Sequence, residues 1–287
     1  MSSDEISFEL FRYDPSLAAA VIFIILFLLI TIVHAYQMFR TRTWFFIPFV
    51  IGGCCQWIGY IGRAISSTES PNWTLPPYII QTILPLVAPA LYAASIYMVL
   101  GRIILVTNGE KYSIIKKNFL TKIFVASDIV SFLLQGGGGG IMASATAEAL
   151  DTGRNIIIGG LVVQVVIFSV FAVTAAIFHW RMRTNPTEHA RNFKWELHLY
   201  VLYGASLLIM VRSIFRLIEY VEGNDGYLIS HEIFLYIFDS ALMFACMVLL
   251  AWYHPSEINA LLKGGERKAV RRVFMIYSPL NSSTSLA

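Results

Sequence analysis

The chain has 287 residues, of which 57% are apolar and 14% are charged, and its mean hydropathy is +0.66. A soluble domain carries about a quarter charged residues, so this composition excludes an ordinary water-soluble protein and indicates an integral membrane protein. The net charge of +3 comes from basic residues scattered along the chain, so no basic run points to a nucleic-acid partner.

Seven segments are apolar and long enough to cross a bilayer, which takes about 20 residues. The predicted spans are Leu17–Met38, Trp44–Ile65, Tyr78–Val106, Leu120–Ala145, Asn155–Trp180, Leu197–Ile218 and Glu232–Tyr253. We therefore expect an all-α integral membrane protein with seven transmembrane helices. The expected parts are an extracellular N-terminal tail at 1–16, a transmembrane domain at 17–254 and a basic cytoplasmic tail at 255–287.

The basic residues predict the direction of the spans, because basic flanks stay in the cytoplasm. One set of span ends carries most of them: Arg40, Arg42, Lys111, Lys116, Lys117, Lys122, Arg181, Arg183, Arg191, Lys194, Lys263, Arg267, Lys268, Arg271 and Arg272. This predicts an N-terminus outside the cell and a C-terminus in the cytoplasm. The sequon Asn72-Trp73-Thr74 then falls in an outer loop, which makes Asn72 a candidate glycosylation site.

Polar side chains lie inside several spans, where they are costly and are candidates for function by default. Spacings of four and three place Arg212, Arg216 and Glu219 on one face of the sixth span. The predicted ligand or cavity residues are Gln56, Arg63, Gln81, Asp128, Gln135, Gln164, Arg212, Arg216, Glu219, Glu232 and Asp239. Most of them map to the outer half of the bilayer, so we expect a polar cavity open toward the outer leaflet.

Two interpretations of these charges stay open. The seventh span places Glu232, Tyr236 and Asp239 on one face, and the arginines could pair with Glu232 and Glu219 simply to fix helix packing. Asp128 and Asp239 have no obvious arginine at matching depth. For these two we expect a cavity, proton or ligand role, because an unpaired acid is costly in a membrane.

Glycine and proline interrupt two spans. The fourth span continues past Gln135 into five consecutive glycines, Gly136, Gly137, Gly138, Gly139 and Gly140, although each costs roughly 1 kcal/mol relative to alanine in a helix. Either a neighbouring helix approaches closely over this surface, which we favour, or the helix is loosened and its carbonyls face a cavity. Pro85 and Pro89 remove backbone donors from the third span and are expected to bend it.

Four histidines, His34, His179, His198 and His254, fall at the cytoplasmic ends of spans. Such residues could ligate a metal or a haem iron. None is paired at the two-to-five-residue spacing typical of a metal site. Ordinary interfacial histidines are the favoured interpretation, and no metal or other cofactor is predicted.

Ordered motifs run along the chain: Tyr13-Asp14-Pro15-Ser16, Gly59-Tyr60-Ile61-Gly62-Arg63, Tyr78-Ile79-Ile80-Gln81, Ala88-Pro89-Ala90-Leu91-Tyr92, Gly101-Arg102-Ile103-Ile104, the stretch from Asp128 through Gln135, Gly160-Leu161-Val162-Val163-Gln164, the stretch from Arg212 through Glu219, His231-Glu232, Asp239 and His254-Pro255. On these residues the sequence resembles the fungal lipid-translocating exporter family, also called the resistance-to-aminocholesterol family. The likeness extends from Tyr13 to Pro255. One departure is Gln56, where the family often has an acid, so the role of an acid there is weakened or replaced.

The resemblance implies a plasma-membrane protein, not an enzyme, that moves or releases amphipathic molecules and confers resistance to them. The expected partners are membrane lipids and small amphipaths such as sphingoid long-chain bases, aminosterols, or porphyrins and haem. No phosphate-binding GxxxxGK[ST] loop occurs. Movement would therefore be down a gradient, linked to protons or dependent on another protein.

Two other functions stay open. A seven-helix receptor or lipid sensor would share the topology, but Leu100-Gly101-Arg102 stands where receptors carry Asp-Arg-Tyr. A zinc-dependent membrane lipid hydrolase needs several histidines and an acid around one metal, and the inner-end histidines form no HxxxH-like array.

Overall fold

The computed structural model describes residues 13–142, 146–191, 194–223, 226–264 and 268–277. Much of the expected tails at 1–16 and 255–287, and the last residues of the span expected to end at Ala145, lie outside these ranges. The elements are α1 Leu17–Thr41, η1 Trp44–Phe46, α2 Ile47–Thr68, α3 Leu75–Val106, η2 Glu110–Tyr112, α4 Lys117–Met142, α5 Ala147–Thr184, α6 Glu188–Arg191, α7 Trp195–Glu222, α8 Glu232–Leu235, η3 Tyr236–Ala241, α9 Leu242–Trp252, α10 Ser256–Leu262, β1 Ala269–Arg271 and β2 Met275–Tyr277.

The described chain contains seven helical segments long and apolar enough to cross a membrane, which confirms the predicted fold class. They are Leu17–Thr41, Trp44–Thr68, Leu75–Val106, Phe119–Met142, Glu148–Thr184, Trp195–Glu222 and Glu232–Trp252. The largest difference from the prediction is α5, which begins at Ala147 rather than Asn155. Thr146 caps it by accepting a hydrogen bond from the Ala149 amide at 3.3 Å, so the helix continues beyond its apolar stretch.

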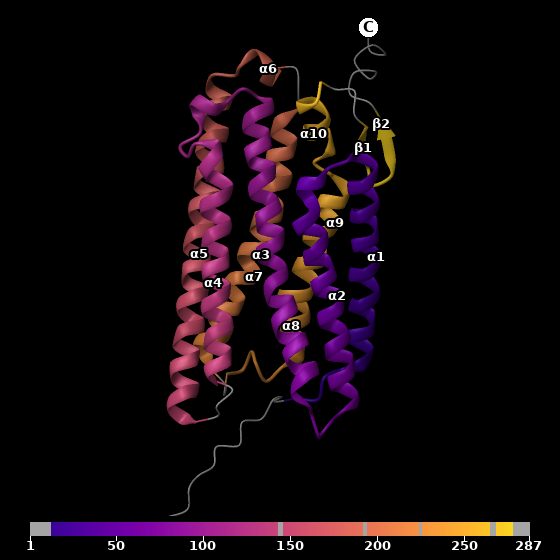
Figure 1. The fold of residues 1–287 in the computed structure, drawn as a ribbon, viewed down its shortest axis with the longest axis vertical. Helices are drawn as coiled ribbons and strands as arrows, with labels where there is room; N and C mark the ends of the chain where they lie inside the picture. The colour runs from indigo at the N-terminus through magenta and orange to yellow at the C-terminus, as the bar shows by residue number, and fades with distance from the viewer. Residues whose placement is uncertain (1–12, 143–145, 192–193, 224–225, 265–267, 278–287) are drawn as a thin grey trace, which may run out of the picture.

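The long helices run side by side along the long axis of the molecule (Figure 1). The α4–α5 pair forms one side, α1 and α2 form the other, and α3 and α7 lie between them. The seventh span is built from α8, η3 and α9 in succession. Within it η3 is a π-helical turn, a distortion that occurs often at functional sites.

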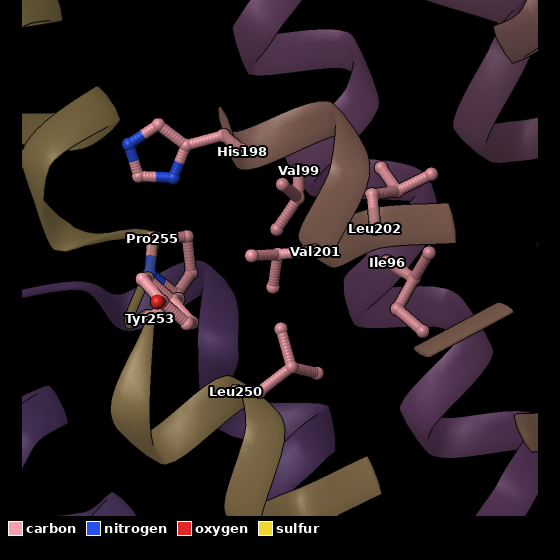
Figure 2. Close-up of a pocket in the computed structure, with 8 residues that line it drawn as sticks. All are labelled: Ile96, Val99, His198, Val201, Leu202, Leu250, Tyr253 and Pro255. Atoms are coloured by element: carbon pink, nitrogen blue, oxygen red, sulfur yellow. The ribbon is translucent and has the colours of Figure 1, made fainter. Parts of the chain in front are cut away.

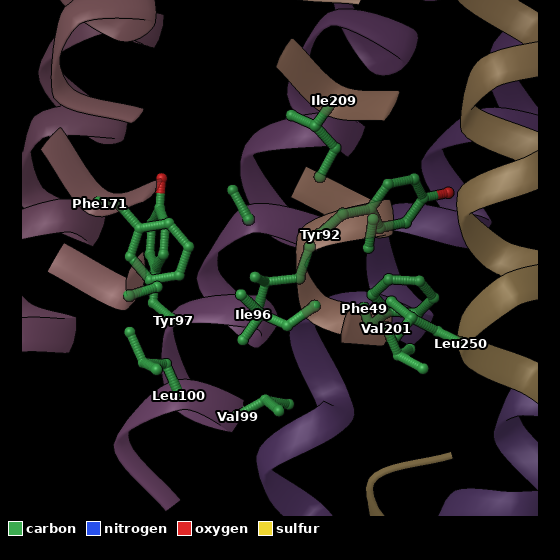
Figure 3. Close-up of a cluster of buried hydrophobic side chains, with 14 of the residues drawn as sticks. Phe49, Tyr92, Ile96, Tyr97, Val99, Leu100, Phe171, Val201, Ile209 and Leu250 are labelled. Carbon is green, nitrogen blue, oxygen red and sulfur yellow. The ribbon is translucent and has the colours of Figure 1, made fainter. Parts of the chain in front are cut away.

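The α3 helix forms the centre of the bundle. In its most apolar 18-residue window 61% of the residues are buried, against 22% for α1. Figure 3 shows its side chains Tyr92, Ile96, Tyr97 and Leu100 inside the apolar core, beside residues from α2, α5, α7 and α9. The burial of α3 therefore puts its two prolines where they can influence several neighbours.

One end of the bundle, called the hairpin end below, carries α6, α10 and the β1–β2 hairpin (Figure 1). The two strands are antiparallel, and Val270 pairs with Ile276. Gln37 of α1 donates from Nε2 to the carbonyl oxygens of Ala251 at 2.8 Å and Val273 at 2.9 Å. The Val270 amide donates to Ser256 Oγ at 2.9 Å, so side chains of α1 and α10 fix the hairpin against the bundle.

The surface of the bundle is apolar where lipid would surround it. Large side chains such as Ile22, Leu29, Leu133 and Leu207 are between 55% and 63% exposed. Exposing these apolar side chains to water would be unfavourable, whereas in a bilayer they contact apolar lipid tails. Their distribution supports the view that lipid is the solvent for which this sequence folds.

Candidate ligand site

Four helical segments bring the predicted polar residues together in the half of the bundle away from the hairpin end. Spacings of four and three put Gln56, Tyr60 and Arg63 on one face of α2, and all three are buried. Opposite them lie the α7 residues Arg212, Arg216 and Glu219, together with Glu232 and Asp239 of the seventh span. The α3 segment contributes Gln81 and Pro85.

Arg63 holds the first ion pair of this cluster. Its Nη2 donates to Glu232 Oε1 at 2.7 Å and to the Tyr13 hydroxyl at 2.9 Å, and its Nε donates to the Tyr236 hydroxyl at 3.0 Å. Glu232 also accepts from the Ser16 amide at 2.9 Å. Because the Arg63 side chain is only 6% exposed, these acceptors replace the water that its guanidinium would otherwise need.

Arg212 holds the second ion pair and also a backbone carbonyl. Its Nε donates to Asp239 Oδ1 at 2.5 Å, and its Nη2 donates to the carbonyl oxygen of Pro85 at 3.0 Å. In a regular helix that carbonyl would accept from the amide four residues on, but residue 89 is proline and has no amide hydrogen. The α3 helix continues through both prolines, and the arginine supplies the missing donor.

Arg216 links two carboxylates. Its Nη1 donates to Glu219 Oε2 at 2.7 Å, and its Nη2 lies 3.3 Å from Asp239 Oδ2. The prediction that Asp239 lacks an arginine at its depth is therefore wrong, since it meets both Arg212 and Arg216. Asp239 is seven residues from the start of its predicted span and Arg212 is six residues from the end of the preceding one, so the two lie at similar depth and the mismatch was a counting error.

Three arginines and three carboxylates thus lie in two ion-paired groups whose total charge is balanced, and none of the six side chains is more than 17% exposed. They are called the ion-pair network below and comprise Arg63 with Glu232, and Arg212 and Arg216 with Glu219 and Asp239. The cavity beside it measures about 20 Å³ and is lined by Gly59, Tyr60, Arg63, Gln81, Pro85, Arg216, Leu235 and Asp239. That volume suits about one water molecule. Two buried polar atoms of its lining residues, Gln81 Oε1 and Arg216 Nε, hydrogen-bond to no other described residue.

The other predicted polar residues form a separate cluster between α4 and α5. Ser131 Oγ donates to the Gly160 carbonyl at 2.6 Å, and Gln135 Nε2 donates to Ser131 Oγ at 2.9 Å and to Gln164 Oε1 at 3.1 Å. Asp128 lies one turn before Ser131 on α4. Ser131, Gln135 and Gln164 link α4 to α5 by hydrogen bonds. Neither these residues nor Asp128 belong to the ion-pair network.

The glycine run lies within a continuous helix, and its five members have two different surroundings. A Cβ on Gly138 would stand 2.5 Å from the carbonyl oxygen of Gly153 on α5, whereas Gly136, Gly137, Gly139 and Gly140 face open space. The close approach therefore involves Gly138, with Gly153 as its counterpart. Small residues at such a crossing let two backbones pack together in lipid.

Comparison of the sequence with known proteins gives a family. Residues 49–260, which include all the predicted ligand residues, match the family described as RTA1 like protein. The chain belongs to this family. That confirms the resemblance drawn from the motifs, since the match covers most of the chain.

Three curated relatives from Saccharomyces cerevisiae are similar over most of their length. Protein RTM1 is 37% identical over 84% of this chain and 90% of its own. Protoporphyrin uptake protein 1 is 36% identical over 86% and 92%. The sphingoid long-chain base transporter RSB1 of strain Lalvin EC1118 / Prise de mousse is 27% identical over 84% and 72%. No solved structure matches this member of the RTA1-like family.

Four histidines of this RTA1-like chain lie toward the hairpin end: His34, His179, His198 and His254. His34 contacts the Met247 carbonyl oxygen at 2.9 Å, and His198 lies 3.2 Å from Glu257 Oε2. Figure 2 shows His198 above a cavity of about 10 Å³ lined mainly by aliphatic side chains such as Ile96 and Leu250. The described residues include no group of three or more His, Cys, Asp or Glu side chains that could hold a metal ion.

Sequence patterns missed several members of the site. Tyr13 and Tyr60 were not singled out, although Tyr60 shares the spacing of Gln56 and Arg63 and hydrogen-bonds to Ser240. The carbonyl of Pro85 was missed as a site member, although Pro89 four residues on signals that this carbonyl lacks its helical donor. Gln56 is buried, and its amide nitrogen hydrogen-bonds to no described residue. Asn72 is exposed between α2 and α3, where glycosylation stays a prediction.

Proposed function

We propose that this chain is a membrane transporter of lipid-like, amphipathic molecules, and that the ion-pair network binds the polar head of the cargo. The observation that carries the proposal is the presence of three arginines and three carboxylates, each at most 17% exposed, among membrane-spanning helices. Such groups are costly in a bilayer and are retained at sites that handle ions or ligands. The apolar tail of the cargo would stay in the surrounding lipid.

The balanced charge of the network suits head groups of either sign. The ammonium of a sphingoid base or an aminosterol would compete with an arginine for Asp239 or Glu232. The carboxylates of a porphyrin would bind Arg63, Arg212 or Arg216 instead. Two relatives, named as a sphingoid long-chain base transporter and a protoporphyrin uptake protein, represent the two chemistries.

The conformation described here is closed around the network. A cavity of about 20 Å³ is far smaller than the pockets of 300–1,000 Å³ that hold drug-sized ligands. Cargo must therefore separate the helices that carry the pairs. The π-helical turn of the seventh span and the prolines of α3 are the backbone irregularities that would absorb this motion.

We also propose that the N-terminus lies outside the cell and the C-terminus in the cytoplasm, at the plasma membrane. Basic residues that follow α1 and α5 and those of the C-terminal segment gather at the hairpin end (Figure 1), as the positive-inside rule requires of a cytoplasmic face. With this orientation the ion-pair network lies in the outer half of the bilayer. Cargo would then be handed to, or taken from, the outer leaflet.

The test is a flip assay on purified protein in vesicles, with a fluorescent sphingoid base and, separately, a porphyrin, with and without a pH gradient. The informative variant replaces both members of one pair, Arg212→Met with Asp239→Leu, because it removes the charges without leaving either unpaired. We expect flipping to fall at least tenfold. The matched control, Glu196→Gln, removes a half-exposed acid 4.0 Å from Arg183 at the other end of the bundle and should flip as the parent does.

Two outcomes would overturn the proposal. If the folded double variant flips cargo at the parental rate, the network only fixes helix packing. If the parent moves neither cargo yet recruits an intracellular partner when the cargo is added, the protein is a lipid sensor rather than a transporter.

A further inference from the structure

Asp128 of α4 is a buried acid that the ion-pair network does not use. It is 4% exposed, and its Oδ2 makes no hydrogen bond to any described residue. Tyr97 of α3, the titratable side chain that interacts with it, lies twelve residues along α3 from Pro85, which is about 18 Å at 1.5 Å per residue. Asp128 is therefore a second, independent polar site in the membrane.

Tyr97, the side chain that interacts with Asp128, lies among aromatic rings. The Tyr97 ring packs against Phe124, Phe168 and Phe171, with centroid separations of 5.2, 6.1 and 4.6 Å. Figure 3 shows Tyr97 and Phe171 side by side in this cluster. The Tyr97 hydroxyl is buried and has no hydrogen bond of normal geometry to the described residues, and the Asp128 carboxyl is the titratable group that it faces.

The other hydroxyl and amide groups near Asp128 on α4 are already used. Ser127 donates to the Ile123 carbonyl at 2.9 Å, Ser131 donates to the Gly160 carbonyl at 2.6 Å, and Gln135 donates to Ser131. None of these donors turns toward the carboxylate. A charged Asp128 would therefore have no set of hydrogen bonds to replace its hydration.

No cation compensates the carboxylate either. From α3, Tyr97 is the titratable group that faces it, while Arg102 donates to Asn259 at 2.9 Å and stacks over Phe45. The segment of α5 that packs against this part of α4, residues 161–178, contains no ionisable side chain. On α4 itself the nearest base is Lys122, which is exposed, and Asp128 forms no ion pair within the described residues.

We propose that Asp128 carries a proton in this conformation and is the proton-binding site of the protein. Burying an ionised carboxylate without a partner costs so much free energy that the group takes up a proton instead. The neutral acid then needs only the weak contact with Tyr97. When α4 moves away from α3 and water enters, the O–H bond breaks, the proton passes to water and the carboxylate keeps the electron pair.

This site supplies a physical link between proton movement and the position of the α4–α5 pair. The two helices are clasped by Ser131, Gln135 and Gln164 and meet closely at Gly138 and Gly153, so they would move as one body. Protonation favours the contact with α3, and deprotonation favours separation. The role in transport rests on the proposed function, whereas the protonation itself does not.

Infrared spectroscopy of the purified parent protein at pH 7 tests the proposal directly. A protonated carboxylic acid gives a carbonyl band distinct from carboxylate and amide bands, and this band shifts in D2O. We expect the parent to show such a band, the Asp128→Asn variant to lose it, and the Tyr97→Phe variant to keep it at a shifted frequency. Glu257→Gln is the matched control, since Glu257 is paired with His198 and should contribute no such band.

An Asp128→Asn spectrum identical to that of the parent overturns the proposal. If this variant does not fold, the decision falls to Tyr97→Phe, and an unmoved band overturns the proposal in the same way. In vesicles, Asp128→Asn should abolish acceleration of flipping by a pH gradient while keeping flipping down a cargo gradient. If the band is present in a protein that flips no cargo, the proposed transport function is wrong and the proton site still holds.

Discussion

Arg212 donates from Nη2 to the carbonyl oxygen of Pro85 at 3.0 Å, the oxygen that Pro89 leaves without its helical partner. One side chain thus completes the hydrogen bonding of another helix while it holds Asp239 with its Nε. The unpaired carbonyl of α3 gains a hydrogen-bond donor, and the buried guanidinium of α7 gains an acceptor. This relationship ties the shape of the central helix to the ion-pair network.

Restoring the missing amide should weaken that tie. In Pro89→Ala the amide of residue 89 can bond to the Pro85 carbonyl and displace Arg212 from it. We expect Arg212→Met to cost less stability in the Pro89→Ala background than in the parent, with a coupling of about 1 kcal/mol in a double-mutant cycle. Thermal unfolding of the four proteins in one detergent measures this, and additive changes would show that the hydrogen bond contributes nothing.

Removing one member of the second ion pair should lower the stability of the protein more than removing both members. Asp239→Asn leaves Arg212 and Arg216 buried with one carboxylate fewer, which we expect to cost roughly 3–5 kcal/mol. Arg212→Met combined with Asp239→Leu should cost less, because no buried charge stays unpaired. Unfolding midpoints give the comparison. If the single variant is the more stable of the two, the pair does not act as described.

The glycine run provides a matched pair of substitutions one residue apart. Gly138→Ala would bring a methyl group to 2.5 Å from the Gly153 carbonyl oxygen, whereas Gly137→Ala would meet nothing within 4 Å. We expect the first to lower the unfolding midpoint. The second should be neutral or raise stability by up to about 1 kcal/mol, because alanine is the better helix former. Equal effects at the two positions would rule out the close approach of α4 and α5.

The contact of α10 with α7 should depend on pH. Burial acts to raise the pKa of Glu257, but the hydrogen bond and charge of His198, with a further contribution from Arg271, outweigh it and lower the pKa. A carboxyl whose pKa is lowered on folding stabilises the fold above its unfolded value, about 4.3, and loses this effect as the pH falls through the folded value. Glu257→Gln should therefore lower the unfolding midpoint at pH 6 and have little effect in strong acid. A constant difference between pH 3 and pH 6 would contradict this.

The residue pattern was enough to identify lipid as the surrounding solvent, to count the spans and to show which of them carry polar side chains. Long apolar runs with few charges give seven helices because every backbone group in lipid must be paired within its own helix, and that requirement is local. The same locality explains why spacings of four and three correctly grouped Arg212, Arg216 and Glu219 on one face of α7.

Which polar groups meet became clear only from the tertiary structure. The partners lie on different helices, and sequence periodicity does not encode the relative height and rotation of two helices. The tertiary structure gave Asp239 two arginine partners, and it gave Arg212 a backbone acceptor on α3. It left Asp128 with Tyr97 among aromatic rings. The two acids look alike in sequence, yet packing surrounds one with positive charge and the other with apolar side chains, and that difference separates a salt bridge from a site that holds a proton.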